Sequence, residues 1–585
     1  MAALALSHLE VSVKIIDRRI PGETAGQGDG IQPRMSEMWD ALGIGAELRE
    51  ASAQIHRIVI YGPNAQGSGI EEAGQASNVS VDATSRPFET VTASSTIEDI
   101  LTRALKARGV VIEQPFVPQT LRIVEQEDGA GEAHVEVAVV KLDEEYIQSS
   151  GVRQVDRAKL VGTPEAIQES HIIRAKYVLG CDGAHSWVRR AVNISMEGET
   201  TDLVWGVIDF TPETDFPSPR AKNVIASPLT GGIAWIPRED NSARVYVRLP
   251  TAPDTIAADQ TQKSASKDSR EKIMQTIEKA FLPYTMRFIN ITWCNEYKIG
   301  QRVARTFSSA RRVYLLGDAG RTHSPMAGQG ANGAMTDGWN LAWKLAYVLR
   351  GHASPCILDT YEEERRAHAL QLILFDRAVF ELFRPDTFTA EGYLELWRRN
   401  TMFLSGLGVK HTSRLTVPDA DGVAPGLHVG ERAPYAIVTR HSDWQQFSLL
   451  ELMLYNGRSK LVLLPGDTRN PAIAQRLACF VESLVESVGG KVGKLLDVFT
   501  VLNTPKEAPF KLERRMPILC TDENVYADES GRLEARQTGK LYQRLGIRPE
   551  EGAAVLVRPD AIMAMVTTID AENADRIQSY FANLL

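Results

Sequence analysis

Helical and strand-like patterns of apolar residues alternate along the first part of the chain. Residues 1–8 have a helical pattern, and the β-branched run VSVKIID at 11–17 then predicts a strand that ends on an acid. A helix that leads into such a strand is typical of the second half of a βαβ dinucleotide-binding unit. We therefore expect a Rossmann-like site in which Asp17 binds an adenosine ribose, with capping of the strand end as the alternative.

Longer elements are predicted in the middle of the chain. An amphipathic helix is expected over 33–52, and three alternating segments within 203–250 predict an antiparallel sheet. Short buried strands are expected at 177–180 and 313–316. The second strand precedes a long helix over 329–350, so the pattern favours strand–turn–helix units of the kind that build nucleotide sites.

The last third of the chain has a different pattern. After a helix over 358–384, the prolines and glycines of residues 385–430 predict a linker. Residues 431–585 have the strand and helix order of a small thioredoxin-like domain, without the paired cysteines of redox members. The expected fold class is therefore α/β. A discontinuous Rossmann-like nucleotide-binding domain is expected from residues 1–87, 170–200 and 300–384. An antiparallel-sheet substrate domain, interleaved with it along the chain, is expected from residues 88–169 and 201–299.

Composition narrows the class of protein. The 585 residues carry a formal net charge of −9, and no apolar run reaches the roughly 18 residues that a membrane-spanning helix needs. This composition argues against a membrane span and against a nucleic-acid partner held by bulk positive charge. The five cysteines are scattered singly, which predicts no metal site or dithiol centre and favours a reducing, cytoplasmic location.

The strongest motif is LLGDAGRTHSPMAGQGANGAMTDGWNLAWKL, residues 315–345. A buried strand ends at Asp318, which can accept hydrogen bonds from a ribityl or ribose hydroxyl. Residues 328–332, GQGAN, then open a helix whose free N–H groups can meet a phosphate or a flavin ring. Glycine is required where a flat ring or a phosphate approaches the backbone closely. The alternative is an ordinary strand–loop–helix turn with glycines for packing.

A second motif, YVLGCDGAHSWVRRAV at 177–192, combines a strand, Asp182 and Gly183, and a basic helix start. An Asp-Gly turn after a strand is weak evidence alone. Its position about 130 residues before the first motif makes the pair specific, because both strand ends would then flank one nucleotide site.

The two motifs resemble those of group A FAD-dependent aromatic hydroxylases, in particular the phenol 2-monooxygenase branch. The segments GQGDGIQPR (26–34), IPREDNSARVYVRL (236–249) and YKIGQRVARTFSSARRVYLLGDAG (297–320) resemble that branch as well. The resemblance implies a p-hydroxybenzoate hydroxylase-like fold with a C-terminal thioredoxin-like domain, FAD as cofactor and NADPH as co-substrate. It also implies hydroxylation of a small phenolic substrate by molecular oxygen, through a flavin hydroperoxide, in a homodimer.

The resemblance also implies roles for individual residues. Asp29 would lie beside the substrate, with Arg238 and Tyr246 near it. A buried carboxylate or tyrosinate can take the proton of a phenol, and an arginine can stabilise negative charge on a reduced flavin. The alternatives are a turn-forming role for Asp29 and a structural cation–tyrosine pair for the other two.

A larger set of residues is implied for cofactor binding. Arg34 resembles the family's flavin-contacting arginine, and a solvated arginine at a helix start is its alternative. The complete implied set is Asp17, Arg18, Gln27, Arg34, Asp182, Tyr246, Asp318, Pro325, Gly328, Gln329, Gly330 and Asn332.

Three departures from the family pattern bear on the substrate. Ser94 to Glu98 stands where relatives often have Gln-Gly-x-Ile-Glu, Gly320-Arg321 replaces Cys-His, and Met326 replaces a lysine. These positions are expected near the ring or the substrate. The apolar Met326 predicts a different, larger aromatic substrate than simple phenol.

The first half of the βαβ unit, with its Gly-x-Gly-x-x-Gly turn, would have to lie upstream of Met1. We expect a chain of these residues alone to fold poorly and to hold FAD weakly, because a central strand and a phosphate-binding turn would be lost. A start assigned too late, or a trimmed chain, is one explanation; a genuine short and inactive product is the other. A non-catalytic, flavin-deficient homologue is the alternative function. A flavin halogenase is disfavoured because Ile233 replaces the first Trp of the Trp-x-Trp-x-Ile-Pro motif.

Overall fold

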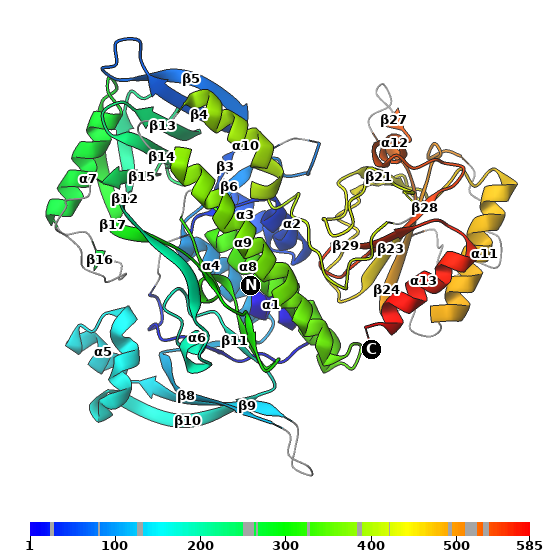
Figure 1. Ribbon diagram of the computed structural model, residues 1–585, viewed down its shortest axis with the longest axis horizontal. Helices are drawn as coiled ribbons and strands as arrows, with labels where there is room; N and C mark the ends of the chain where they lie inside the picture. The colour runs from blue at the N-terminus through cyan, green and yellow to red at the C-terminus, as the bar shows by residue number, and fades with distance from the viewer. Residues whose placement is uncertain are drawn as a thin grey trace.

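The computed structural model has a larger lobe, drawn from blue to green, and a smaller lobe, drawn from yellow to red (Figure 1). The C-terminal end lies at the junction of the two lobes. No helix in the described part of the chain is long and apolar enough to cross a bilayer. The structure describes residues 1–23, 28–79, 82–125, 133–249, 263–264, 267–324, 328–382, 389–419, 422–488, 494–508, 523–530 and 537–584.

A large sheet forms the upper part of the larger lobe. Within the described residues it has the order β16-β17-β12-β15-β14-β13-β4-β5, and β20 pairs with β17. The antiparallel pairing predicted within 203–250 is confirmed, since β15 pairs antiparallel with both β12 and β14. The strands are β4 (Arg57–Pro63), β5 (Ile70–Ser77), β12 (Met196–Thr214), β13 (Lys222–Ser227), β14 (Gly231–Pro237), β15 (Ala243–Leu249), β16 (Lys263–Ser264), β17 (Met286–Ala304) and β20 (Arg321–Thr322).

Different elements cover the two faces of this sheet. Helix α7 (Lys267–Ala280) covers one face with Ile273 and Ile277, in a cluster rich in aromatic rings that includes Trp235. Against the other face lies a small sheet of β2 (Gly30–Ile31), β6 (Glu89–Val91) and β3 (Ala53–Ile55). The candidate substrate site lies between the large sheet and this small one.

The nucleotide-binding half is built from short parallel strands and long helices. Strand β1 (Ile15–Ile16) pairs with β7 (Ile112–Glu113), and β11 (Val178–Gly180) pairs with β19 (Val313–Leu315), which also pairs with β18 (Ser308–Ser309). Of the strand predicted over 11–17, only β1 (Ile15–Ile16), near the C-terminal end of the segment, pairs with β7.

The helices of this half follow the predicted patterns, with one break. Helix α1 (Ala2–His8) packs so tightly on α8 (Gly330–Leu349) that a Cβ at Gly338 would lie 2.8 Å from that of Ala2. The helix predicted over 33–52 is broken into α2 (Pro33–Ala41) and α3 (Gly45–Glu50), because Gly43 takes a left-handed φ of 76° between them.

Peripheral elements complete the larger lobe. A three-stranded sheet of β8, β9 and β10 lies at its lower edge (Figure 1). The remaining elements are α4 (Ser94–Ala107), β8 (Phe116–Val124), β9 (His134–Leu142), α5 (Glu144–Ser150), the 3-10 helices η1 (Gln154–Gly162) and η2 (Pro164–Ala166), β10 (Ile167–Ala175), α6 (Trp187–Ala191), the 3-10 helices η3 (Gly317–Ala319) and η5 (Pro355–Leu358), and α9 (Asp359–Leu382).

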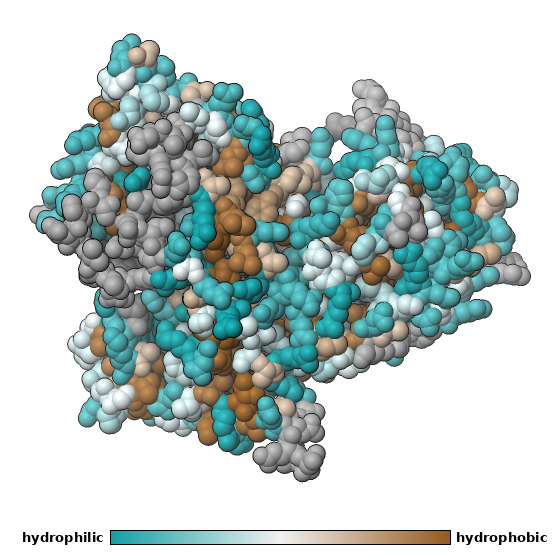
Figure 2. Space-filling model, viewed as in Figure 1, coloured by the Kyte–Doolittle hydropathy of each residue, from teal (hydrophilic) through white to brown (hydrophobic). Residues whose placement is uncertain are grey.

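Residues 385–430, predicted as a linker, contain a helix, α10 (Ala390–Leu404). Tyr393 and Trp397 of this helix pack on β4 in a cluster with Ile58 and Ile60. The pattern was missed because the prolines and glycines that follow position 417 dominated the segment. On the face shown in Figure 2, apolar side chains gather where α9 crosses the larger lobe, and Leu374 of α9 is 65% exposed.

The smaller lobe is a sheet covered by helices. Within the described residues its strand order is β22-β21-β25-β24-β23-β28-β29. The strands and helices of this region fit the expected α/β order. They are β21 (Ile437–Arg440), β22 (Gln446–Ser448), β23 (Ser459–Gly466), α11 (Pro471–Val488), β24 (Leu496–Leu502), β25 (Val525–Ala527), β26 (Glu529–Ser530), β27 (Gln537–Thr538), α12 (Lys540–Leu545), β28 (Ala553–Val557), β29 (Met563–Thr567) and α13 (Ala571–Ala582).

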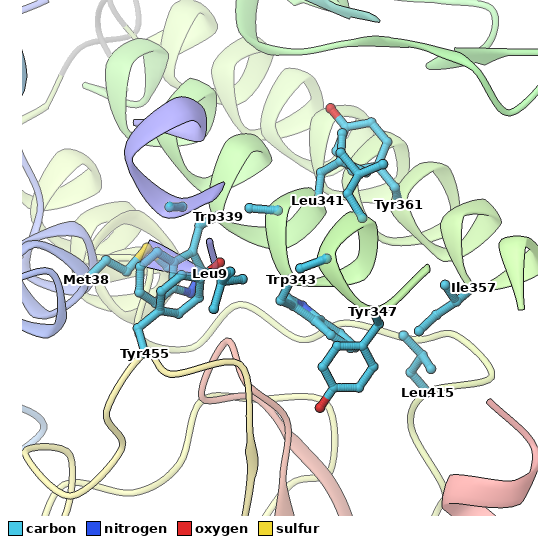
Figure 3. Packing of buried hydrophobic residues seen from close by; sticks show 14 of the residues in the cluster. Leu9, Met38, Trp339, Leu341, Trp343, Tyr347, Ile357, Tyr361, Leu415 and Tyr455 are labelled. Carbon is cyan, nitrogen blue, oxygen red and sulfur yellow. The ribbon is translucent and has the colours of Figure 1, made fainter. Parts of the chain in front are cut away.

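The two lobes share one hydrophobic core. A single cluster of buried residues runs from α1 and α8 into β23, α11 and α13. At the junction Trp339 of α8 stacks on Tyr455 of the smaller lobe, with ring centroids 3.9 Å apart (Figure 3). Burial of apolar surface between the lobes therefore contributes to the stability of both.

Candidate active site

A buried ion cluster lies on the face of the large sheet that meets the small one. Antiparallel pairing of β12 with β15 places Asp209 directly opposite Arg244. Arg244 donates from Nε to Asp209 Oδ1 at 2.6 Å and from Nη2 to Oδ2 at 2.7 Å. Both residues are buried. This bidentate geometry fixes the plane of the guanidinium, because both of its hydrogen bonds end on one carboxylate.

Arg238 joins the same carboxylate from the turn after β14. Its Nη1 donates to Asp209 Oδ2 at 2.5 Å, and its Nη2 donates to Glu239 Oε1 at 3.2 Å. Asp209 is thus the shared anchor for two arginines. Arg238 Nε is buried and has no hydrogen-bond partner among the described residues.

Asp29 lies across from this anchor, at the start of the small sheet. Its Oδ2 is 3.3 Å from Arg244 Nη1, and the same Arg244 nitrogen lies 3.5 Å from the Tyr246 hydroxyl. Burial raises the pKa of Asp29, although Arg244 and Arg238 oppose the shift. Burial also raises the pKa of Tyr246 above its usual value, so this phenol stays neutral through the neutral pH range.

The three residues predicted as catalytic, Asp29, Arg238 and Tyr246, therefore lie in one cluster. Sequence reasoning missed the two residues that hold them, Asp209 and Arg244. Both carried a signal: Arg244 is the arginine of the RxY motif itself, and Asp209 interrupts an apolar strand at a position whose side chain must be buried.

Asn332 connects this cluster to the start of helix α8. Its Oδ1 accepts from the backbone N–H of Gln32 at 2.8 Å, and its Nδ2 donates to the carbonyls of Gly30 and Gly328 at 2.8 and 2.9 Å. Both polar atoms of the Asn332 side chain therefore already have hydrogen-bond partners within the protein. Predicted as a cofactor contact, Asn332 in the structure holds the segment that carries Asp29 against the first turn of α8.

The first turn of α8 has no side-chain cap among the described residues. The helix begins after Gln329, and Gln329 Nε2 donates to the carbonyl of Leu404 at 2.5 Å. Gly328 has a φ of 61°, and a Cβ there would lie 3.6 Å from the nearest atom. Uncapped N–H groups of Gly330 and its neighbours can therefore meet an electron-rich group.

Two acids line the strand ends on the nucleotide side. Asp318 reaches solvent, yet enough protein surrounds it that desolvation raises its pKa, against the influence of His323 and Arg321. Asp182 Oδ2 accepts from the backbone N–H groups of Trp187 at 2.6 Å and Val188 at 3.0 Å, whereas its Oδ1 is buried without a partner among the described residues. An accessible acid and an unsatisfied one suit the hydroxyls of a flavin nucleotide.

Three further predicted cofactor residues, Asp17, Arg18 and Arg34, have partners within the protein. Asp17 accepts from Arg19 N and Nε, both at 2.9 Å, and the carbonyl of Arg18 accepts from Arg157 at 3.2 Å. Arg34 is buried and donates to Glu37 and to the smaller lobe. Gln27 and Pro325 lie outside the described residues.

The residues that depart from the family pattern do not all lie near the candidate substrate site. Arg321 was expected near the ring, but it is buried and donates to Asp337 at 2.6 Å, where it supports the α8 helix rather than a substrate. Ser94 Oγ donates to the carbonyl of Gly28, beside Asp29. Met326 lies outside the described residues.

The residues present fit FAD. The uncapped α8 turn offers hydrogen-bond donors for a flavin ring, and the glycine at 328 leaves this position without a side chain. The solvent-open Asp318 and the unsatisfied Asp182 oxygen offer acceptors for the hydroxyls of the flavin nucleotide. The substrate cluster adjoins this surface through the Asn332 contacts.

Comparisons with known proteins match family models to both lobes. Residues 153–376 match the family model described as an FAD binding domain, and residues 406–585 match that of the phenol hydroxylase C-terminal dimerisation domain. An FAD-dependent monooxygenase of Aspergillus terreus is 31% identical, with 100% of this chain and 94% of that protein covered. A phenol 2-monooxygenase of Aspergillus fumigatus is 29% identical, with 95% and 90% covered.

A bacterial relative and solved structures extend the comparison. The 3-hydroxybenzoate 4-monooxygenase of Comamonas testosteroni is 28% identical, with 100% of this chain and 92% of that protein covered. The crystal structure of aklavinone-11 hydroxylase with FAD and aklavinone matches with a TM-score of 0.68 at 20% identity, covering 100% of this chain and 96% of that one. The structural match shows that the fold is shared.

Proposed function

Because this chain belongs to the family of FAD-dependent aromatic monooxygenases related to phenol 2-monooxygenase, we propose that it hydroxylates a phenolic ring with NADPH as reductant. The overall reaction would be phenol + O2 + NADPH + H⁺ → dihydroxybenzene product + NADP⁺ + H2O. The observation that carries the proposal is the buried Asp29, whose Oδ2 has no hydrogen-bond partner among the described residues. FAD, when bound, supplies the activation of dioxygen.

Asp29 suits the proton of a phenolic hydroxyl. A phenol attacks an electrophilic oxygen well only as its proton leaves, so a base within hydrogen-bond reach assists the step. The raised pKa of Asp29 makes its carboxylate a stronger base than an exposed aspartate. The nearby guanidinium of Arg244 keeps the carboxylate available in its charged form.

Tyr246 and Arg238 would orient the substrate and balance charge. The neutral Tyr246 hydroxyl can donate a hydrogen bond to the phenolic oxygen as negative charge develops there. Arg238, fixed by Asp209, adds positive charge at the same place. The wall of Val91, Trp205 and Ile236 excludes water around these groups.

Further parts of the proposal concern partners. NADPH would bind transiently, react and leave, as the family resemblance implies. A homodimer is supported by the description of the family model that matches residues 406–585, and a cytoplasmic location by the singly placed cysteines. A substrate larger than phenol is supported by the departures at Ser94 and Met326.

The test is to reconstitute the purified protein with FAD and to offer it a panel of phenolic compounds. We expect a flavin spectrum, NADPH oxidation stimulated by some of the phenols, and a product that gains one ¹⁸O atom from ¹⁸O2. Tight FAD binding without any stimulated oxidation or labelled product would contradict the proposed reaction. Absence of a flavin spectrum after FAD is added would favour a flavin-deficient homologue.

A further inference from the structure

The turn between β28 and β29 of the smaller lobe carries a fully buried arginine, Arg558, which reaches into the larger lobe. It donates to Glu364 of α9 at 2.6 Å (Nη1 to Oε1) and 3.1 Å (Nη2 to Oε2). It also donates to Asp560 at 3.0 Å (Nε to Oδ1) and 2.5 Å (Nη2 to Oδ2). One guanidinium thus joins a helix of the larger lobe to a turn of the smaller one.

The partner Glu364 is itself held by helix α8. Lys344 Nζ donates to Glu364 Oε2 at 3.0 Å, and Asn340 Nδ2 donates to the same oxygen at 2.7 Å. Although burial opposes the shift, Arg558 and Lys344 hold the pKa of Glu364 well below its usual range. Two cations and two carboxylates therefore balance in a site that excludes water, so each depends on the others being present.

The same turn contacts the start of helix α2. The backbone carbonyl of Asp560 accepts from Arg34 Nη2 at 2.7 Å and from Trp339 Nε1 at 3.3 Å. Glu37 accepts from the other end of the Arg34 guanidinium at 3.1 Å. Since Arg558 fixes the Asp560 side chain, it also fixes the carbonyl that holds Arg34.

We propose that Arg558 and Asp560 of the smaller lobe are positioning residues for the flavin site, because the turn that they form holds the start of α2 against α8, whose uncapped first turn faces FAD. The inference rests on the proposed function. Helix α2 begins at Pro33, directly after the segment that carries Asp29, and Asn332 ties that segment to α8. The turn at 558–560 contacts both helices at once, so the smaller lobe completes the site in addition to any role in dimerisation.

The test compares Asp560→Asn with Asp497→Asn. The first keeps the shape of the side chain but weakens the contact with Arg558. The second is a matched control, because Asp497 pairs with Lys460 and Arg458 inside the smaller lobe. We expect Asp560→Asn to weaken FAD binding to the apoprotein about tenfold and to speed amide hydrogen exchange over 33–41, and Asp497→Asn to do neither.

Wild-type protein supplies a second measurement that needs no variant. Addition of FAD should slow amide exchange at 558–562 as well as at 33–41, because the two segments are coupled. The inference would be overturned if the FAD dissociation constant of Asp560→Asn equalled that of the wild type. It would also be overturned if FAD did not change the rate of amide exchange at 558–562 in the wild-type protein. A wild-type protein that holds no FAD would contradict the proposed function, and the exchange of 33–41 in Asp560→Asn would still decide whether the turn positions α2.

Discussion

Arg244 Nη1 lies 3.3 Å from Asp29 Oδ2, yet that oxygen has no hydrogen-bond partner among the described residues. The guanidinium of Arg244 attracts the carboxylate of Asp29, but no N–H group is placed to donate a hydrogen bond to this oxygen among the described residues. Buried acceptors are rarely left unsatisfied without a functional reason. The pair therefore combines an available carboxylate with a cation that stabilises it, which is the arrangement a substrate hydroxyl would complete.

Replacing Asp29 by asparagine should abolish most of the hydroxylation. The amide keeps the size of the side chain but cannot take a proton, and such a group contributes about 10²-fold or more to a rate. Product formation by the FAD-loaded variant should fall by that factor, with FAD affinity unchanged. A variant that retains most of its activity would rule out Asp29 as the base.

The same substitution should stabilise the protein in a pH-dependent way. Burial raises the pKa of Asp29 in the folded state, so its stabilising contribution is complete below its unfolded pKa of about 3.9 and is lost as the pH rises through the folded value. Thermal unfolding should show Asp29→Asn more stable than wild type at pH 7 and equal to it near pH 4. A difference that does not change with pH would contradict the shift.

Replacing Arg244 by methionine should destabilise the fold. The change leaves the buried Asp209 with Arg238 as its remaining described arginine partner, and breaking a buried ion pair typically costs about 3 kcal/mol or more. Urea denaturation measures the loss. Arg287→Met is the control, because Arg287 is 72% exposed in its pair with Glu213 and should cost less than about 1 kcal/mol.

Tyr246→Phe tests the neutral hydroxyl. Loss of one hydrogen bond to the substrate costs about 1 kcal/mol, so kcat/KM should fall about fivefold while the unfolding midpoint changes little. Because the pKa of Tyr246 is raised by burial, the alkaline side of the pH profile should be the same in wild type and variant. A profile whose alkaline limb disappears in the variant would show that Tyr246 titrates in that range.

The shared core predicts that both lobes unfold together. Calorimetry should give a single transition whose calorimetric and van't Hoff enthalpies agree. Trp339→Leu, which removes the stack on Tyr455, should lower the stability by about 2 kcal/mol and keep one transition. Two separate transitions in the wild-type protein would show that the lobes are independent.

Local patterns predicted the longer helices and several of the strands, because a regular helix or strand has its own apolar periodicity. The ends of α8 and the alternation of β15 follow directly from apolar spacing. The break at Gly43 was missed because one left-handed residue interrupts a continuous amphipathic pattern. Helix α10 was missed because turn-forming residues nearby outweighed its apolar face.

Site residues could be predicted from the sequence only where a recognisable motif both contains the residue and implies its role. Asp29, Arg238 and Tyr246 were predicted from the motifs that carry the family resemblance; the structure brings the three side chains together, and their roles stay predictions. The anchor Asp209 depends on the register of β12 against β15, and the contacts of Asn332 join residues 300 positions apart. Pairings of this kind follow from tertiary packing, which single-sequence periodicity does not encode.

The turn at Arg558 also limits how this protein could have changed by recombination. A hybrid that joins residues 1–404 to the smaller lobe of a distant relative would keep both sheets but separate Arg558 from Glu364 and Asp560 from Arg34. The buried Glu364 would then lose the arginine that pairs with it. Exchange of the smaller lobe should therefore succeed only when Glu364 and Lys344 of the larger lobe match the residue that replaces Arg558.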